Sequence, residues 1–485
     1  MGTEQRKVGA YRQLNMFEQP ASRCHGANGE GGTGPGACEE RQISTALNEG
    51  RALAKDLMER ICDRANLNQA YKRVKANKGS PGADGMNVRE LGGWLRAHKD
   101  ELIASLLDGT YRPQPVLRVE IPKPGGGMRQ LGIPTVVDRV VQQAILQVLN
   151  SLFDTTFSES SFGFRPGRGA HDALRQASKY VASGRTIVVD FDLEKFFDRV
   201  NHDVLMARLA RRIGDKRLLR IIRRFLEAGI LADGVCISRH EGTPQGGPLS
   251  PLLANLLLDD LDKELERRGH AFCRYADDCN VFVRTRKAGE RVMATITRYL
   301  ETRLRLRVNR DKSAVAHVSE RKFLGYRLHA GGRLGIAPQS VKRLKERIRE
   351  ITRRNRPLPF EERVRQLNSF LPGWVTYYRL ADCGKRLTRL DQWIRRKLRC
   401  VRLKQCKRAF TIAKFLMGQG VPEEPSWLLA LSGKGWWRLS NTPQTNHAMN
   451  NEWFKGLGLI SLTSRYLELK SSGNRRGTEQ VCPVV

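Results

Sequence analysis

The chain has 485 residues, 40% of them hydrophobic, which allows two or three domains with ordinary cores. Its formal net charge is +35, an excess that favours a polyanionic partner and makes nucleic acid the leading candidate. An anionic membrane surface is the weaker alternative, because the sequence has no apolar run long enough to span a bilayer. We therefore expect no membrane partner.

The first 45 residues offer little that could be buried. The stretch "GANGEGGTGPGACEE" is rich in glycine and predicts a disordered N-terminal tail over residues 1–45. The start "MGTEQRKVGA" has neither a signal-peptide core nor a lipidation pattern, which is typical of an intracellular protein. The ten cysteines are scattered and none forms a C-x-x-C pair, so we expect reduced thiols and no zinc site.

Helices and a hairpin are predicted next along the chain. Residues 52–79 have a helical pattern, and residues 111–134 read as two β-like arms broken by Pro-Gly-Gly-Gly. A second helix follows in "DRVVQQAILQVLNSLF". Its spacing places six apolar residues on one face, which are Val140, Val141, Ala144, Ile145, Val148 and Leu149.

The middle of the chain mixes strands and helices. The run "TIVVDFDL" predicts a short buried strand, and "AFCRYADDCNVFVRT" predicts two strands around a tight turn. Between them, "SPLLANLLLDDLDKELERRG" predicts a helix with Ser250 as N-cap, Pro251 at its first position and Gly269 beyond its end. These elements indicate an α+β core.

After about Gly335 the pattern becomes helical and basic. Between Lys342 and Arg408 there are 22 Lys and Arg residues against 6 Asp and Glu residues. A small helical bundle explains the apolar spacing but not this charge excess, which favours a phosphate-binding surface over an ordinary solvated face. Further on, Trp436 and Trp437 are candidates either for stacking on bases or for core packing.

Asp277 and Asp278 form the central motif, since two adjacent carboxylates repel each other unless a cation lies between them. At the tip of a hairpin, turn geometry can direct both into one region. The segment "VVDFDLEKFFDRVNHD" supplies a third carboxylate at the end of a strand, either Asp190 or Asp192. Three such side chains suit Mg²⁺, which favours oxygen ligands shared with substrate phosphates.

The motifs together resemble those of bacterial group II intron-encoded reverse transcriptases and maturases. "YADD" is similar to the polymerase hairpin of that family, "DFDLEKFFDRVNHD" to its first metal-binding motif, and "GTPQGGPLSPLLANLLLDDLD" to its substrate-pocket loop and helix. "FGFRPGRGAHDAL", "NRDKS" and "FLGY" occur in the expected order, and "LPGWVTYYRLA" with "LDQWIRRKLR" resembles the maturase thumb. The resemblance extends from about Leu67 to Ile460.

The resemblance implies a right-hand polymerase fold. Fingers and palm with an antiparallel sheet would occupy residues 46–335, and a helical thumb or maturase domain residues 336–410. Residues 411–485 would form a C-terminal nucleic-acid-binding extension. Many relatives end in a zinc-dependent DNA endonuclease, but this segment has only His447 and Cys482 of the required ligand types, so we expect no endonuclease.

The resemblance also implies the site residues. Asp192, Asp277 and Asp278 would be catalytic and would hold two Mg²⁺ ions, with Mn²⁺ possible. Asp190 remains the rival for the first position. Phe197, five residues after Asp192, would lie under the nucleotide sugar and exclude a ribose 2′-hydroxyl.

Other residues would contact the nucleotide or the RNA. Lys123 and Arg129 would bind the triphosphate, and the glycines beside Gln245 would let the backbone approach the nucleotide. Lys312 would either protonate the pyrophosphate or simply contact a phosphate. The RNA-binding residues would be Arg395, Arg396, Lys397 and Arg399 of the thumb and Arg165, for which helix capping or packing is the alternative role.

The implied activity is RNA-directed DNA synthesis on intron RNA, with assistance to splicing. The implied partners are group II intron RNA, an RNA template with a DNA primer, target DNA and deoxynucleotides, in the bacterial cytoplasm at the nucleoid. Two alternatives remain open. One is an RNA-binding splicing factor with a vestigial polymerase site, and the other is a domesticated reverse transcriptase in host defence or repair.

Overall fold

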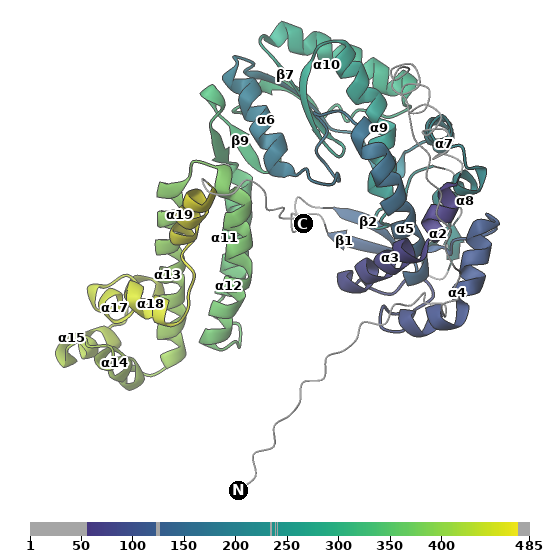
Figure 1. Ribbon diagram of the computed structural model, residues 1–485. Coiled ribbons are helices and arrows are strands. Elements are labelled where there is room, and N and C mark those ends of the chain that lie inside the picture. Colours follow the sequence, from purple (N-terminus) through teal and green to yellow (C-terminus); the bar gives the residue numbers. More distant parts are fainter. Residues whose placement is uncertain (1–55, 123–126, 233–234, 238, 240, 474–485) are drawn as a thin grey trace, which may run out of the picture.

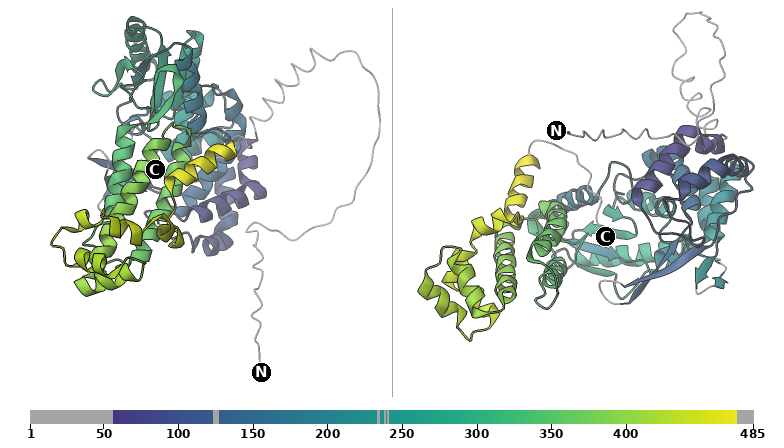
Figure 2. Two further views of the ribbon diagram at one scale, coloured as in Figure 1. Left: turned by 90° about the vertical axis from the view of Figure 1, so that its left-hand side faces the viewer. Right: turned by 90° about the horizontal axis from the view of Figure 1, so that it is seen from below.

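The computed structural model describes residues 56–122, 127–232, 235–237, 239 and 241–473. The predicted tail and Lys123 therefore lie outside the described residues. Helices and strands mix as expected for an α+β fold. In Figure 1 they form an arc, with the N-terminal helices and strands β1 and β2 on one side, a central sheet with helices α6, α9 and α10, and a helical lobe on the other side. The view from below in Figure 2 shows the same order.

The N-terminal part, which we call the fingers, packs four helices against a small sheet. The helices are α2 (Leu57–Cys62), α3 (Arg64–Asn77), α4 (Leu91–Leu107) and α5 (Val136–Phe153). All six apolar residues predicted on one face of α5 are buried, and Thr135 caps the helix by accepting from the Asp138 amide. The predicted hairpin is confirmed as antiparallel strands β1 (Val116–Pro122) and β2 (Met128–Ile133).

The central part, which we call the palm, contains a four-stranded antiparallel sheet in the order β6-β7-β3-β8. Its strands are β3 (Ile187–Phe191), β6 (Ala271–Tyr275), β7 (Asp278–Val283) and β8 (Ala314–His317). The predicted tight turn is confirmed, since Tyr275 pairs with Asp278 and leaves only two residues in the turn. The remaining elements of the fingers and palm are α6 (Ala170–Ala182), α7 (His202–Ala210), α8 (Lys216–Glu227), α9 (Ser250–Arg267), α10 (Arg286–Arg303), β4 (Ile230–Ala232) and β5 (Val235–Ile237).

The two faces of the palm sheet belong to two different hydrophobic cores. Val189 and Phe191 point into a core shared with the fingers helices and with α9 and α10. Val188, which directly precedes Val189, points to the other face and lies with Phe282 in a core shared with α6 and the helical lobe. Because side chains of a strand alternate between faces, one short strand joins both cores.

The start of α9 differs from the prediction. The N-cap is Leu249, and Ser250 is the first helical residue, with Pro251 next to it in the first turn. The Ser250 hydroxyl donates to the Pro244 carbonyl at 2.7 Å, so it fastens the preceding loop instead of capping the helix. Gly269 lies beyond the end of the helix with φ +68°, as predicted.

The helical lobe begins after strands β9 (Tyr326–Leu328) and β10 (Leu334–Ile336). We call this lobe the thumb and C-terminal helices. Its long helices are α11 (Pro338–Ile351), α12 (Phe360–Tyr377) and α13 (Gly384–Cys406). The smaller helices are α14 (Ala409–Met417), α15 (Glu423–Ala430), α16 (Trp436–Leu439), α17 (Pro443–Ala448), α18 (Asn451–Gly456) and α19 (Leu462–Gly473). Trp436 packs against the core, whereas Trp437 is 37% exposed. None of the helices in the described ranges has the length and apolarity needed to cross a membrane.

A buried arginine holds the connection between α11 and α12. Arg363 is 1% exposed, and its guanidinium donates to the carbonyls of Ile351, Arg353, Arg356 and Leu358. Burial lowers the pKa of Arg363, because the charged form loses its hydration. The four carbonyls follow the end of one helix and precede the next, so this side chain fixes the turn between them.

Arg363→Ala is therefore expected to destabilise the thumb by about 3 kcal/mol or more, because it leaves several buried carbonyls without donors. Denaturant unfolding followed by circular dichroism measures the loss. Arg365→Ala on the same helix is the matched control. Arg365 is 76% exposed and pairs only with Glu362, so its loss should cost less than about 1 kcal/mol. Equal losses in the two variants would contradict the assigned role of Arg363.

Candidate active site

The palm sheet brings the three predicted carboxylates together. Phe191, the last residue of β3, pairs with Cys279 of β7. Continuing this register by one residue places Asp192 opposite Asp278, and Asp277 lies in the turn that precedes Asp278. Ala276, the other turn residue, has a positive φ of 59°, which is uncommon for a side chain with a Cβ. Residues about 85 positions apart in the sequence thus meet at one end of the sheet.

The carboxylates repel one another, and their pKa values record it. Burial, together with the charges of Asp190, Asp277 and Asp192, raises the pKa of Asp278 to about 8. The pKa of Asp277 is also raised, mainly by burial and then by Asp192, while nearby Arg129 opposes the shift. At this end of the sheet, the nearby cationic side chains therefore do not offset burial and the repulsion among the carboxylates.

Asp190 and Asp192 have different surroundings. Asp190 accepts from the Arg321 guanidinium at 2.5 and 2.8 Å, and its side chain is 14% exposed. Asp192 is 43% exposed, and its nearest cation is the Lys312 ammonium, 3.7 Å from its Oδ2. Arg321 therefore occupies the carboxylate of Asp190, whereas that of Asp192 stays open, which favours Asp192 for the first catalytic position.

Arg321 also supports Lys312. Its Nη2 donates to the Lys312 carbonyl at 2.5 Å while the same group binds Asp190. Asn309 and Ser313 in the same loop hold the backbone of Asp192, through hydrogen bonds of 2.8 and 3.0 Å. The loop "NRDKS" is thus attached to both the amide and the carbonyl of Asp192, directly after β3.

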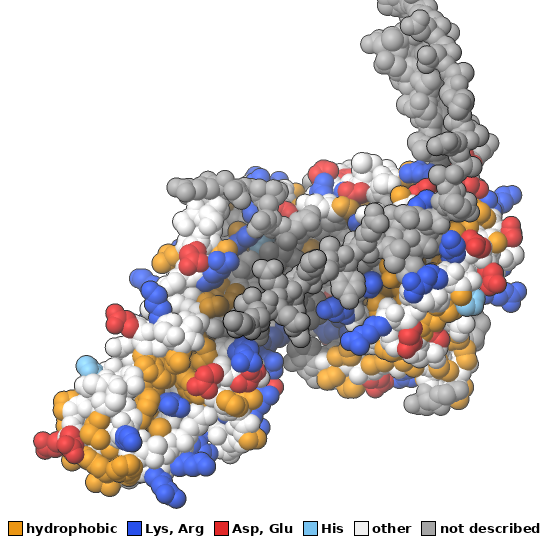
Figure 3. Space-filling view, turned by 60° about the horizontal axis from the view of Figure 1, so that its bottom comes forward, with side chains coloured by type: hydrophobic (Ala, Val, Ile, Leu, Met, Phe, Trp, Pro, Cys, Tyr) orange, Lys and Arg blue, Asp and Glu red, His pale blue; other side chains and the backbone are white. Residues whose placement is uncertain are grey.

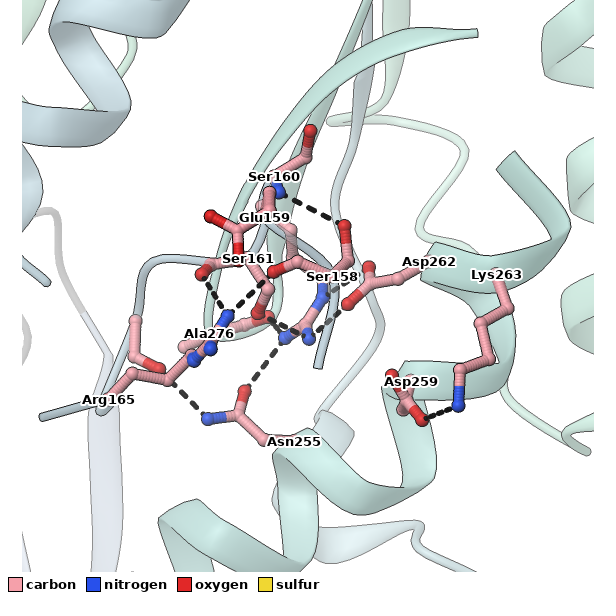
Figure 4. A network of polar contacts seen from close by, with 12 residues as sticks. Ser158, Glu159, Ser160, Ser161, Arg165, Asn255, Asp259, Asp262, Lys263 and Ala276 are labelled. Carbon is pink, nitrogen blue, oxygen red and sulfur yellow. Dashed lines mark hydrogen bonds and ion pairs between the residues drawn. The ribbon is translucent and has the colours of Figure 1, made fainter. Parts of the chain in front are cut away.

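A buried ion pair anchors the turn that carries Asp277. Arg274 is fully buried and binds both oxygens of Asp262 on α9, at 2.7 and 2.5 Å. Its Nη1 donates to the Asn255 side chain and to the Ala276 carbonyl inside the turn. The Ser161 hydroxyl accepts from Nη2 of Arg274. Figure 4 shows Asn255, Ser161 and Asp262 gathered close to Ala276 of the turn.

Gly163 lies against the same turn. A Cβ at this position would be 2.3 Å from the Ala276 nitrogen, closer than real Cβ atoms approach. The Gly163 carbonyl in turn accepts from the Asn255 side chain at 2.8 Å. The motif "FGFRPG" therefore supplies the floor of the catalytic turn, and only glycine fits there.

Arg129 and Gln245 meet in front of the carboxylates. The Arg129 Nε donates to the Gln245 Oε1 at 2.8 Å, although the residues lie on β2 and on the loop before α9. The Gly132 amide also donates to the Gln245 carbonyl, so the loop runs along the fingers hairpin. A pocket of about 320 Å³ borders Gln245. Lys123, the other residue expected at this hairpin, is outside the described residues.

Phe197 lies in a 3-10 turn, Phe196–Asp198, just after the first carboxylate motif. Phe196 is buried at 3% exposure, whereas Phe197 is partly exposed. The Phe197 carbonyl accepts from the Thr243 amide at 2.6 Å. Gly242 has φ +89° and touches the Phe197 and Asp198 carbonyls, so the loop with Gln245 packs directly on this turn.

Two arginines expected to bind RNA are held inside the protein. Arg165 is 7% exposed, and its donors reach Asp154 and the carbonyls of Asp154, Ser158 and Ser161. Arg399 is 9% exposed and donates twice to the Met449 carbonyl. For Arg165 these contacts favour packing, the alternative role considered from the sequence, whereas Arg399 also lines a pocket of the thumb; RNA contact by either side chain stays a prediction.

The other thumb residues are partly exposed. Arg395, Arg396 and Lys397 lie along α13, and Arg396 stacks over the Trp437 ring at 4.0 Å from its centroid. Lys397 is near the same ring and near Trp393. Lys and Arg side chains are spread over the face of this lobe in Figure 3.

The donor set at the carboxylates suits a hard divalent cation. Among the described residues, no group of three or more Asp, Glu, His or Cys side chains lies in an arrangement that could hold a metal ion by itself. An open set of carboxylates is what Mg²⁺ uses when water and substrate phosphates complete its coordination. The raised pKa values of Asp277 and Asp278 fit as well, because a bound cation would relieve their repulsion.

Sequence reasoning missed the supporting residues. Arg274, Asn255 and Asp262 are polar residues inside apolar runs, and such residues are buried only when they are satisfied. That signal was available in "LLANLLLDDLD" and "FCRYADD". The ion pair of Arg321 with Asp190 has no comparable signal, because it joins residues 131 positions apart without a distinctive local pattern.

Gly163→Ala is expected to destabilise the palm by about 2 kcal/mol and to displace the catalytic turn, because the added methyl overlaps the Ala276 nitrogen. Thermal unfolding measures the change. Gly93→Ala in α4 is the control, since no atom lies within 4 Å of its added Cβ and alanine favours a helix by up to about 1 kcal/mol. If the Gly163→Ala protein were as stable as the wild type, the turn would have space for the added methyl group, which would contradict the structure.

Comparison with known proteins identifies two families in this chain. Residues 121–328 match the family "Reverse transcriptase (RNA-dependent DNA polymerase)", and residues 341–415 match "Group II intron, maturase-specific domain". Protein YkfC of Escherichia coli (strain K12) is 35% identical over 303 residues, which cover 54% of this chain and 80% of YkfC.

Two further similarities are more limited. The group II intron-encoded protein LtrA of Lactococcus lactis subsp. cremoris is 38% identical over 195 residues, which cover 40% of this chain but only 32% of LtrA. The solved "Partial Cas6-RT-Cas1--Cas2 complex" overlaps 51% of this chain and 42% of that chain at 27% identity, with a TM-score of 0.34, too low to carry an argument. With the two family matches and YkfC, the chain belongs to the reverse transcriptases, the RNA-directed DNA polymerases, and carries the maturase-specific domain of group II intron-encoded proteins.

Proposed function

We propose that this chain copies group II intron RNA into DNA and assists the splicing of that RNA as a maturase. The observation that carries the proposal is the convergence of Asp192 with Asp277 and Asp278 at one end of the palm sheet in a chain of the reverse transcriptase family. The maturase role is supported by the match of residues 341–415 and by the similarity to LtrA. The RNA itself would be the catalyst of splicing, and the protein would hold its active structure.

Reverse transcriptases use divalent metal ions. In our proposal the ions are two Mg²⁺, with Mn²⁺ as a substitute, and Asp192, Asp277 and Asp278 hold them. When bound, such ions activate the primer 3′-hydroxyl and neutralise charge on the leaving pyrophosphate. Two observations support this assignment. The Asp192 carboxylate is partly exposed, and burial and the neighbouring carboxylates raise the pKa of Asp278.

The chain's own cations and aromatic residues would position the nucleotide. Arg129, oriented by Gln245 and close to Asp277, would bind the triphosphate together with Lys123. Phe197 would lie under the sugar and exclude a ribose 2′-hydroxyl. Lys312 is 69% exposed and lies beside Asp192, so its ammonium is available to contact or protonate the pyrophosphate.

RNA and other nucleic acids are the partners of this family. In our proposal they are group II intron RNA, an RNA template paired with a DNA primer, and target DNA, with deoxynucleotides as substrates. Arg395, Arg396, Lys397 and Arg399 of α13 would bind RNA phosphates, whereas the donor groups of Arg165 serve packing. We place the protein in the bacterial cytoplasm at the nucleoid, because its charge of +35 suits a nucleic-acid-rich environment.

Primer extension on an RNA template tests the activity. Asp277→Asn should lower the rate at least about 1,000-fold, equivalent to about 4 kcal/mol, because the active site loses a metal ligand. RNA binding, followed by fluorescence anisotropy, should stay close to that of the wild type. Asp311→Asn is the control, since Asp311 is an exposed carboxylate in the neighbouring loop with no assigned role.

The outcomes separate the candidate functions. Retained synthesis by Asp277→Asn would disprove the metal assignment. If the wild type binds RNA but extends no primer, the chain is an RNA-binding splicing factor with a vestigial site.

Metal binding has a readout that does not depend on activity. Millimolar Mg²⁺ should raise the thermal unfolding temperature of the wild type, because a ligand that binds only the folded state stabilises it by about 1.4 kcal/mol at ten times its Kd. The rise should be absent in a variant combining Asp192→Asn with Asp277→Asn. NaCl at the same ionic strength controls for screening. A rise of equal size in this variant would place the ions elsewhere.

A further inference from the structure

A pocket of about 580 Å³ lies in the thumb and C-terminal helices, between α13 and the segment that contains α17 and α18. Figure 1 shows these two short helices beside α13. Helix α13 contributes four arginines, Gln392 and Trp393 to the lining of the pocket. The opposite wall consists of Asn441, Asn446, Asn450 and Asn451. It is separate from the palm carboxylates, since none of its lining residues belongs to the fingers or palm.

The pocket carries uncompensated positive charge. Its arginines are Arg389, Arg395, Arg396 and Arg399, and no acidic side chain lines it. Within the described ranges none of the four forms an ion pair with a carboxylate; Arg396 and Arg399 donate instead to the neutral carbonyls of Trp437 and Met449. Burial and the charge of Arg395 lower the pKa of Arg399 to about 10. An anionic group in the pocket would relieve this repulsion.

The asparagine wall narrows the choice of anion. A free phosphate or a carboxylate accepts hydrogen bonds only, and arginines alone would satisfy it. The Asn450 side-chain carbonyl already accepts from the Trp453 amide, but Asn441, Asn446 and Asn451 also present amide carbonyls that can take a donor. The edge of a nucleobase offers donors and acceptors together. Trp393 adds an aromatic surface, which bases use for stacking.

The size of the pocket suits a single nucleotide. Pockets for small ligands measure about 300–1,000 Å³, and this one lies within that range. A paired helix does not fit such a space, whereas one extruded residue does. Extrusion costs least where the base is already unpaired, as in a bulge or loop.

We propose that this pocket receives one unpaired nucleotide of a nucleic-acid strand, with its phosphate against the α13 arginines and its base against the asparagine wall. The inference rests on the proposed function insofar as it needs a nucleic-acid partner. It adds to that function a site that binds unpaired nucleotides selectively. A basic surface alone would contact any phosphate backbone.

The first test compares two RNA hairpins of equal length, one fully paired and one with a single-nucleotide bulge. The wild type should bind the bulged hairpin about tenfold more tightly, as expected for one stacked base. A 2-aminopurine placed in the bulge should change its fluorescence on binding. DNA hairpins of the same design identify the source: an equal preference means that the ribose is not read, and a preference for RNA alone means that the 2′-hydroxyl is.

The second test removes the amide wall without changing charge. The double variant Asn441→Ala with Asn451→Ala alters two exposed side chains that make no hydrogen bond among the described residues. Its preference for the bulge should fall to about twofold or less, with unchanged affinity for the paired hairpin. Lys385→Gln, an exposed position on the same helix outside the pocket, is the control and should leave the preference intact.

Equal binding of both hairpins by the wild type, or no fluorescence change, would overturn the inference. So would a double variant that keeps the full preference or weakens both hairpins alike. These results leave the proposed function standing as long as the protein binds RNA and extends a primer. A protein that binds neither hairpin at all would contradict the proposed RNA partner as well as the pocket.

Discussion

The active site depends on one buried ion pair, that of Arg274 with Asp262. Placing two charges in the interior is costly, and the cost is offset only when every donor and acceptor has a partner. Here the guanidinium reaches Asp262, Asn255, Ser161 and the Ala276 carbonyl, all at 2.5 to 2.9 Å. The turn that carries Asp277 is therefore held from below by a group on its own strand and by helix α9.

Such an anchor is needed because the site above it is electrostatically unfavourable. Asp190, Asp277 and Asp278 all have raised pKa values, which means that the fold holds carboxylates near one another at a free-energy cost. A flexible turn would relieve the repulsion by moving its carboxylates apart. The Arg274 network and the close packing of Gly163 on the turn prevent this movement, so the repulsion remains available to favour a bound cation.

Sequence motifs predicted the candidate metal-binding carboxylates better than the residues that hold these carboxylates in place. Asp192, Asp277 and Asp278 follow from local strand and turn patterns, and the structure places them at one end of the sheet. The burial of the Arg165 and Arg399 side chains could not be predicted from the sequence. A basic residue in a basic segment looks the same in sequence whether its side chain turns outward or satisfies a carbonyl inside, and only the tertiary contacts of Asp154 or Met449 decide. Ser250 was misplaced for a similar reason, because its partner is the Pro244 carbonyl of a tertiary loop.

This distinction changes how the charge of the chain should be understood. Arg165, Arg274, Arg363 and Arg399 are all buried, and each fastens backbone carbonyls of segments that lack regular structure. An arginine suits this task, since its five donors form a rigid fork and its charge persists when buried. Part of the +35 charge thus connects segments of the chain inside the protein. The cations that do face outward on α13 lie beside aromatic and amide side chains, so this surface has the composition to recognise bases as well as phosphates.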